Sequence, residues 1–203
     1  MTYRNCGLWF GPIAALLLLA GILAIGWMIP GYSHVRQTVS ELGEVGSAGR
    51  LAFSLLLLLV AACLIVFAVG VGRTLRRAGC STLPAYFVAA MAISAAGVGM
   101  FAFPHPLHNA FGMSELVGYQ APLVAALVRG SVPDARRLAT FSIVMYALGV
   151  LAIAANMATL DRHGGLWPHI QPFYGVVQRL LFAAWFFWCA GYAVLLMRMR
   201  RPG

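Results

Sequence analysis

Long apolar runs separated by short polar segments make up most of the chain. A hydrocarbon core about 30 Å thick needs roughly 20 helical residues, because each residue advances a helix by about 1.5 Å. Six runs are long enough: 8–29, 51–72, 83–103, 109–128, 138–160 and 173–197. The pattern predicts an all-α, polytopic membrane protein with six transmembrane helices, in a single domain over residues 1–203.

None of the six helices is expected to be broken at the membrane midplane. The first is expected to be retained, because its apolar run is longer than that of a signal peptide and no small-residue cleavage pattern follows it. Many secondary transporters contain an inverted repeat and helices broken near the membrane midplane. Neither feature is visible in the sequence, so the pattern does not point to a channel or a transporter, although both classes stay open.

The arginines predict the orientation in the membrane. Of the 203 residues, 62% are hydrophobic and 9% are charged, which is more apolar surface than a water-soluble domain can cover. Ten of the 14 basic residues lie near the two termini or after the second and fourth apolar runs. The positive-inside rule then makes both termini cytoplasmic. The net charge of +9 is explained by this topology, and no nucleic-acid partner is expected.

The outer side is predicted to carry the polar chemistry. All five histidines fall in or beside the three outer loops: His34, His105, His108, His163 and His169. In the first of these loops, Ser33 suits the start of a helix and Gly43 suits its end. A short outer-face helix is therefore expected after the first transmembrane helix, lying at the membrane interface or over the bundle.

His105 and His108 form an H-x-x-H pair at the predicted rim of the bundle. With a third ligand from His163, His169 or a carboxylate, the pair would suit zinc. The alternative is that these histidines bond to loop carbonyls or meet lipid phosphates. No other cofactor is predicted, because the sequence has no C-x-x-C motif and because bis-histidine haem binding requires histidines within facing helices.

Glu115 and Arg179 fall inside two predicted helices. Each lies about six positions, or roughly 9 Å, below the predicted outer surface. An ionised group at that depth is costly unless it is paired. We therefore expect these two side chains to meet, with Gln120, Gln178 and Asn156 as neutral partners. The pair would act either as a clamp between helices or as part of a site for an anionic or zwitterionic ligand.

Two functional interpretations follow. In the first, an outer pocket binds a lipid headgroup or a small polar ligand through Ser33, Arg36, Ser40, Glu41, Glu115, Asn156, Gln178 and Arg179. In the second, the chain is a metal-dependent intramembrane hydrolase that acts on a lipid-like substrate. Its zinc would be bound by His105, His108 and one of His163 or His169, with Glu41 or Glu115 as general base. The residues alone do not decide whether the protein is an enzyme.

Three outer stretches carry a family resemblance. They are Tyr32-Ser33-x-x-Arg36 with Ser40-Glu41-Leu42-Gly43, then Phe103-Pro104, and then Gly175-x-x-Gln178-Arg179-Leu180. Together they resemble a prokaryotic six-helix membrane family known as domain of unknown function 998. The resemblance implies a multi-pass protein of a prokaryotic plasma (inner) membrane, and it implies no activity, substrate or cofactor.

The chain also departs from that family's pattern. Family members often carry an aspartate shortly after the Phe-Pro pair, where this chain has His105-Pro106. A function that needs a carboxylate at that position is therefore not expected here. The first outer loop is also loosely similar to that of eukaryotic six-helix proteins implicated in lipid handling. Membrane lipid or a lipid-like small molecule is the expected partner.

Overall fold

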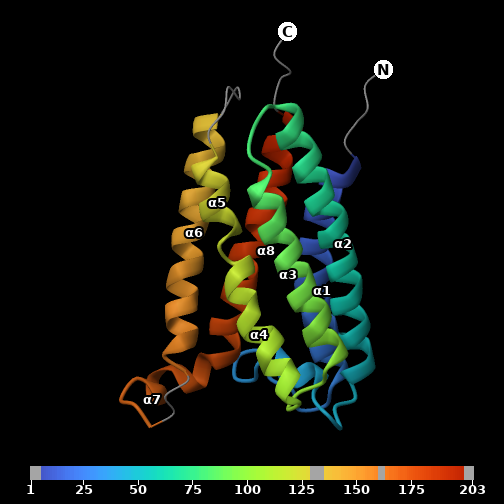
Figure 1. Ribbon diagram of the computed structural model, residues 1–203. Helices are drawn as coiled ribbons and strands as arrows, with labels where there is room; N and C mark the ends of the chain where they lie inside the picture. Colours follow the sequence, from blue (N-terminus) through green and yellow to red (C-terminus); the bar gives the residue numbers. More distant parts are fainter. Residues whose placement is uncertain (1–5, 129–134, 160–162, 199–203) are drawn as a thin grey trace.

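Helices form most of the computed structural model, which describes residues 6–128, 135–159 and 163–198 (Figure 1). The long helices are α1 (Phe10–Met28), α2 (Arg50–Arg77), α3 (Leu83–Met100), α6 (Ala135–Met157) and α8 (Tyr174–Arg198). The shorter elements are η1 (Cys6–Trp9), η2 (Ser40–Gly43), α4 (Pro106–Gly118), α5 (Ala121–Leu127), α7 (Trp167–Ile170) and η3 (Gln171–Phe173). No strand occurs in these three described ranges.

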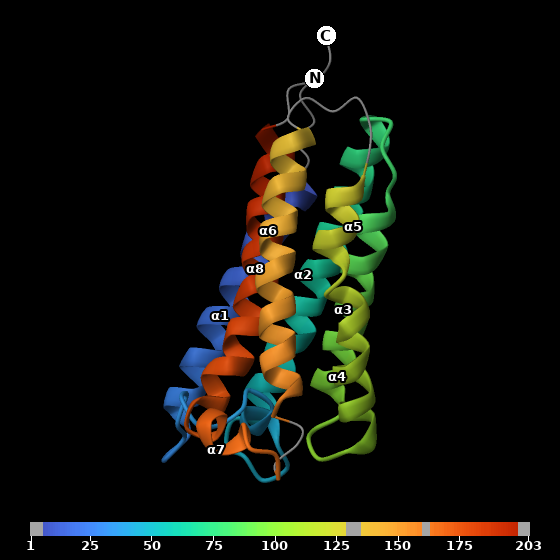
Figure 2. The same ribbon diagram turned by 90° about the vertical axis from the view of Figure 1, so that its left-hand side faces the viewer.

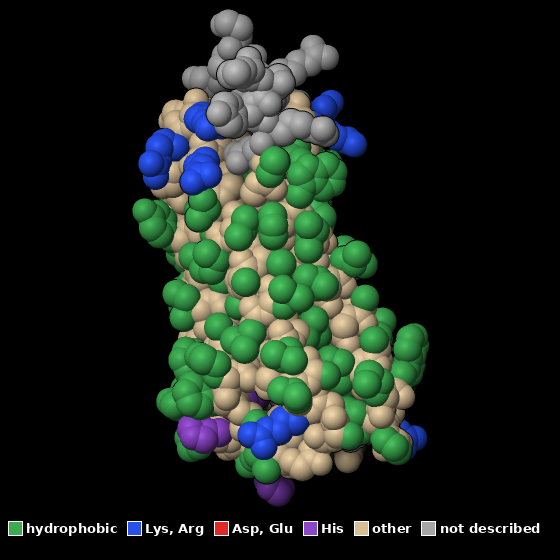
Figure 3. Space-filling model, turned by 90° about the vertical axis from the view of Figure 1, so that its right-hand side faces the viewer, with side chains coloured by type: hydrophobic (Ala, Val, Ile, Leu, Met, Phe, Trp, Pro, Cys, Tyr) green, Lys and Arg blue, Asp and Glu red, His purple; other side chains and the backbone are tan. Residues whose placement is uncertain are grey.

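Five helices are long and apolar enough to cross a membrane: α1, α2, α3, α6 and α8, where η1 extends α1 and where α7 and η3 extend α8. They correspond to five of the six predicted runs, although residue 160, the predicted end of the fifth, lies outside the described residues. Much of their surface is apolar, as the face in Figure 3 shows. The chain is therefore a helical, multi-pass membrane protein.

The remaining predicted run, 109–128, is not one continuous helix. It consists of α4 and α5, which follow one another along the bundle with a break at Tyr119 and Gln120 (Figure 2). Pro122 explains the break, because proline has no N–H to donate to the carbonyl four residues earlier and its ring crowds that carbonyl. The prediction of a single helix over 109–128 was therefore wrong.

The two ends of the bundle differ in charge. Helix α1 begins and α8 ends at the same end of the bundle (Figure 1). Figure 3 shows most of the visible Lys and Arg side chains at that end, and the visible histidines at the opposite end together with a smaller share of the basic side chains. We call these the arginine-rich end and the histidine-rich end. The predicted segregation of histidines is thus present in the structure, while the side of the membrane that each end faces stays a prediction.

The predicted helix from Ser33 to Gly43 is shorter than expected. Only η2 forms there, and a turn precedes it. The Glu41 carboxylate accepts hydrogen bonds from the backbone N–H and the hydroxyl of Thr38, each at 2.9 Å. This interaction resembles half of a capping box just before η2, which begins at Ser40 instead of Ser33. Val39 and Leu42 are buried, so the loop folds over the bundle.

Helix packing leaves α4 attached along one side. Helix α3 packs against α2 and α4, while α6 packs against α5 and α8, and α8 packs against α1. Helix α4 has no comparable contact with α6, α8 or α1. A space between α4 and the α1, α6 and α8 side of the bundle follows from this arrangement.

Candidate functional site

The Arg179 side chain fastens the first loop to the start of α8. Its Nη1 donates to the carbonyl oxygens of Gln37 and Gly175, each at 2.9 Å. Its Nη2 donates to the Tyr32 hydroxyl at 2.6 Å and lies 3.3 Å from Nδ1 of His34. The guanidinium therefore bonds mainly to the loop, so the predicted pairing of Arg179 with Glu115 was wrong. We call Arg179 and its four partners the Arg179 cluster.

The loop side of the Arg179 cluster is itself held in place. The Tyr32 hydroxyl donates to the Thr38 carbonyl at 2.7 Å. Burial raises the pKa of the Tyr32 hydroxyl, although its bond to Arg179 opposes that shift. Burial lowers the pKa of His34, and the positive charge of Arg179 lowers it further. Both groups therefore stay neutral beside the guanidinium at neutral pH, which suits a structural contact.

Close backbone packing completes this junction. A Cβ atom on Gly175 would lie 2.3 Å from the Gln37 carbonyl oxygen and 2.6 Å from that of His34. Only glycine permits this approach of α8 to the loop. Gln178, one turn further along α8, accepts a 2.6 Å hydrogen bond from the backbone N–H of Val39 through its Oε1.

A cavity of about 470 Å³ lies beneath the loop, in the histidine-rich half of the bundle. Its volume is within the range of about 300–1,000 Å³ that is typical of ligand sites. The apolar lining residues are Leu18, Val39, Phe53, Leu57, Val60, Met91, Ala95, Val98, Gly112, Met113, Leu116, Ile153, Met157, Leu181, Phe182 and Phe186. The polar lining residues are Ser40, His108, Asn109, Glu115, Tyr119, Asn156 and Gln178.

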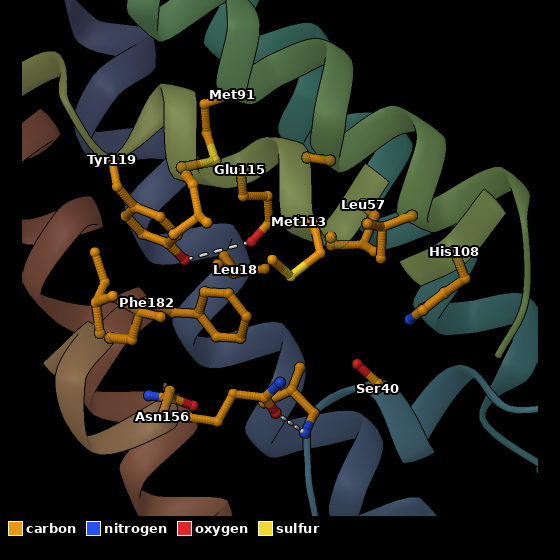
Figure 4. A pocket seen from close by; sticks show the side chains of 18 of the residues that line it. Leu18, Ser40, Leu57, Met91, His108, Met113, Glu115, Tyr119, Asn156 and Phe182 are labelled. Carbon is orange, nitrogen blue, oxygen red and sulfur yellow. Dashed lines mark hydrogen bonds between the residues drawn. The ribbon is translucent and has the colours of Figure 1, made fainter. Parts of the chain in front are cut away.

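The Glu115 carboxylate points from α4 toward this cavity (Figure 4). Its Oε2 accepts a weak hydrogen bond from the Tyr119 hydroxyl at 3.4 Å, and Oε1 has no partner among the described residues. In the described side chains, the polar atoms that are fully buried and have no partner are His34 Nε2 and Arg179 Nε. Glu115 Oε1 has no partner either, but it is not one of these atoms and so is not fully buried. The carboxylate is therefore accessible from the cavity.

His108 presents one ring nitrogen to the cavity (Figure 4). Its Nδ1 lies 2.7 Å from the Phe101 carbonyl oxygen, which only accepts hydrogen bonds. Nδ1 must therefore carry the proton, and Nε2 of the neutral ring has a free lone pair. His108 thus faces the same space as Glu115 while its other nitrogen is fixed by the backbone.

Asn156 faces the cavity from α6, on the opposite wall from Glu115 (Figure 4). Its Nδ2 donates to the carbonyl oxygens of Ala152 and Val177, at 2.8 and 3.1 Å, which ties α6 to α8. The amide oxygen is left with no hydrogen-bond donor among the described residues. Asn156 therefore contributes an acceptor to the cavity.

The break between α4 and α5 borders the cavity and is fully supplied with donors. The last four carbonyls of α4 accept from the backbone N–H of Tyr119, the Gln120 side chain, the backbone N–H of Gln120 and the Trp185 indole. The indole bond, from Nε1 to the Gly118 oxygen, is 3.0 Å long and buried. Because a bare carbonyl in a membrane is costly, these bonds stabilise the interruption.

The predicted site residues divide into two groups. Ser40, Glu115, Asn156 and Gln178 line the cavity, whereas Arg179 and Glu41 bond within or to the loop. Ser33 lies in the turn before η2, and Arg36 is exposed. The sequence reasoning missed Tyr119, Met113 and Phe182 because their apolar surroundings resemble any helix core.

The four histidines proposed for zinc do not converge. His105 accepts from the Leu107 N–H at the start of α4, at 3.1 Å. His163 and His169 are exposed near α7, and only His108 lines the cavity. In the described parts of the chain, no three His, Cys, Asp or Glu side chains lie close enough to hold a metal ion.

The fold and the cavity define a helical membrane protein with an amphipathic cavity. The chain belongs to the family described as "Protein of unknown function (DUF998)", whose family model matches residues 12–195. The resemblance seen in the three outer stretches is thereby confirmed. No curated protein and no solved structure matches the chain.

Proposed function

We propose that this protein binds a lipid-like amphiphile in the cavity between α4 and the α6 and α8 side of the bundle. The observation that carries the proposal is the composition of the cavity wall. Apolar side chains, chiefly Leu, Met and Phe, supply most of it, and a few polar groups from α4, α6, α8 and η2 complete it. A molecule with a hydrocarbon part and one polar part matches such a wall better than a fully polar solute does.

Access from the membrane supports the same proposal. Met113 of α4 and Met157 of α6 line the cavity and are 52% and 39% exposed, so the cavity reaches the lipid-facing surface between these two helices. Helix α4 does not pack closely on α6. An amphiphile can therefore enter sideways from the bilayer. With the predicted topology, it would come from the outer leaflet.

Two glycines allow a matched test of this proposal. Gly112 of α4 lines the cavity, and a Cβ atom there would meet no heavy atom within 4 Å. Gly149 of α6 has the same open surroundings but does not line the cavity. Gly112→Phe therefore fills the site, and Gly149→Phe makes the same chemical change away from it.

Lipid extracted from the purified proteins would be quantified by mass spectrometry. The wild type and Gly149→Phe are expected to retain an amphiphile in near-stoichiometric amount through extensive detergent washing. Gly112→Phe is expected to lose most of it while it elutes from gel filtration as the wild type does. Equal retention by all three proteins would contradict the proposal.

The interrupted helix favours a second candidate, which is movement of the bound amphiphile across the membrane. Broken helices border the substrate sites of many transporters, and the α4 and α5 break borders this cavity. Vesicles containing the protein would be tested for transfer of a fluorescent single-chain lipid between leaflets. If transfer is no faster than in vesicles containing Gly112→Phe, the protein binds the amphiphile without moving it across the membrane. The metal-dependent hydrolase has no comparable support, since its ligands do not converge.

A further inference from the structure

The polar groups that line the cavity leave mainly hydrogen-bond acceptors unoccupied. Glu115 offers Oε1, and Asn156 offers its amide oxygen, because its nitrogen already donates twice. His108 offers the lone pair of Nε2, because its Nδ1 proton is bonded to the Phe101 carbonyl. The cavity therefore offers mainly unoccupied acceptors, which suit a ligand that donates hydrogen bonds.

The donors that remain are neutral. Gln178 keeps its amide N–H₂ group, since its oxygen is the atom bonded to Val39. Ser40 contributes a hydroxyl, which can donate or accept. Asn109 is exposed near the mouth of the cavity. None of these groups would compensate the charge of a bound phosphate or carboxylate.

The charged groups in and near the cavity also disfavour an anionic ligand. Among the described residues, Glu115 supplies the only carboxyl group in the cavity wall, and no Lys or Arg side chain lines it. The partly buried guanidinium of Arg179 does not line the cavity; it bonds to Gln37, Gly175 and Tyr32 and lies beside His34. An anionic headgroup would thus meet a carboxylate without a neighbouring cation, which is unfavourable in an apolar space.

We infer that the polar part of the bound amphiphile is a protonated amine or another organic cation that contacts Glu115. An ammonium group only donates hydrogen bonds, which suits the unoccupied acceptor of Glu115, and Asn156 and His108 add acceptors elsewhere in the same wall. The Tyr119 and Phe182 rings line the same cavity and present faces that attract cations. The hydrocarbon part would lie against Leu57, Met91 and their neighbours. This inference rests on the proposed function and adds the class of ligand.

Three probes with the same twelve-carbon chain test the inference: dodecylamine, dodecanol and dodecanoate. Each would be titrated at neutral pH into the full-length protein in detergent, after delipidation, and binding followed by native mass spectrometry. Dodecylamine is expected to bind at least about tenfold more tightly than dodecanol, because its ammonium group forms a charge-assisted hydrogen bond with the Glu115 carboxylate and the hydroxyl forms a neutral one. Dodecanoate is expected to bind most weakly.

Glu115→Gln should remove most of the preference for dodecylamine and leave dodecanol binding within about threefold of wild type. Glu44→Gln, which removes a carboxylate outside the cavity wall, should leave the preference unchanged. Should Glu115→Gln fail to fold, the ranking of the three probes on the wild type still decides.

Dodecanoate binding as tight as that of dodecylamine, with sensitivity to Gly112→Phe, would overturn the inference and leave the proposed function standing. So would an unchanged preference in a folded Glu115→Gln. Binding of no probe, or binding that Gly112→Phe does not alter, would contradict the proposed function itself.

Discussion

Arg179 and Glu115 are both ionisable groups in the histidine-rich half of the bundle, but their surroundings are opposite. The guanidinium of Arg179 makes bonds to Gln37, Gly175 and Tyr32 and lies beside His34. The carboxylate of Glu115 has one long bond, to Tyr119, and faces a cavity. A group that makes several internal hydrogen bonds stabilises the fold, whereas a group left facing a cavity is available to a ligand.

Replacing Arg179 should have the largest effect on stability. Arg179→Leu leaves two carbonyls and a hydroxyl without their charged donor, so we expect the free energy of unfolding to fall by about 3 kcal/mol or more. Thermal unfolding in mild detergent would measure the loss. Arg36→Leu is the matched control, since Arg36 is exposed in the same loop and should change stability by less than about 0.5 kcal/mol. Equal effects of the two changes would remove the structural role given to Arg179.

Trp185→Phe should cost about 1–3 kcal/mol, because it leaves the Gly118 carbonyl unpaired at the break between α4 and α5. Trp188→Phe is a matched comparison that removes a bond of the same 3.0 Å length to the Ser142 hydroxyl. That hydroxyl can turn to a carbonyl of its own helix, so the cost should be smaller. Unfolding midpoints of the two variants would be compared, and the reverse order would show that the break does not depend on the indole.

The two charged groups should act independently. Since Arg179 and Glu115 do not pair, the effects of Arg179→Leu and Glu115→Gln on unfolding should add, with a coupling energy below about 0.5 kcal/mol. Glu115→Gln alone should be neutral or slightly stabilising in protein without ligand, because it removes an ionisable group from an apolar cavity. A double-mutant cycle measures both quantities, and a coupling energy above about 1 kcal/mol would restore the ion pair that the sequence suggested.

The smallest expected effect is a dependence of protein stability on pH, which arises from His34 in the Arg179 cluster. The pKa of His34 is lowered in the folded state by burial and by Arg179, so the unfolded chain binds a proton more readily. Stability should therefore be fully present above the unfolded pKa of about 6.5 and should decrease as the pH falls below it. Unfolding midpoints between pH 5 and pH 8 would show this slope. His34→Gln should flatten the slope, and an unchanged slope would assign it to other groups.

Much of the fold could be predicted because a membrane makes hydrophobicity decisive. Five apolar runs correspond to five long helices, and the segregation of arginines and histidines follows from loop position alone. Pro122 is a sequence signal for the break in the fourth run, but the apolar residues on both sides of it favoured the prediction of one helix. Its stabilisation by Trp185, 67 positions away in sequence, could not be predicted from local pattern.

The candidate site was predictable in composition but less so in geometry. Ser40, Glu115, Asn156 and Gln178 were selected as polar residues at one end of the bundle, and all four line the cavity. The pairing of Arg179 failed because equal depth along two helices does not fix the direction of the side chains. Its partners are the carbonyls of Gln37 and Gly175 and the Tyr32 hydroxyl, and a backbone carbonyl has no sequence signature.

The most direct test of the amphiphile site is to find where a bound amphiphile lies. A dodecylamine derivative with a diazirine near the end of its chain would be photolysed on the purified protein, and the labelled residues identified by peptide mass spectrometry. The account predicts labels concentrated on cavity residues of α4 and α8, such as Met113, Leu116 and Phe182, and their loss in Gly112→Phe. Labels spread over lipid-facing residues such as Leu55, Leu59 and Ile93, without enrichment in the cavity, would contradict it.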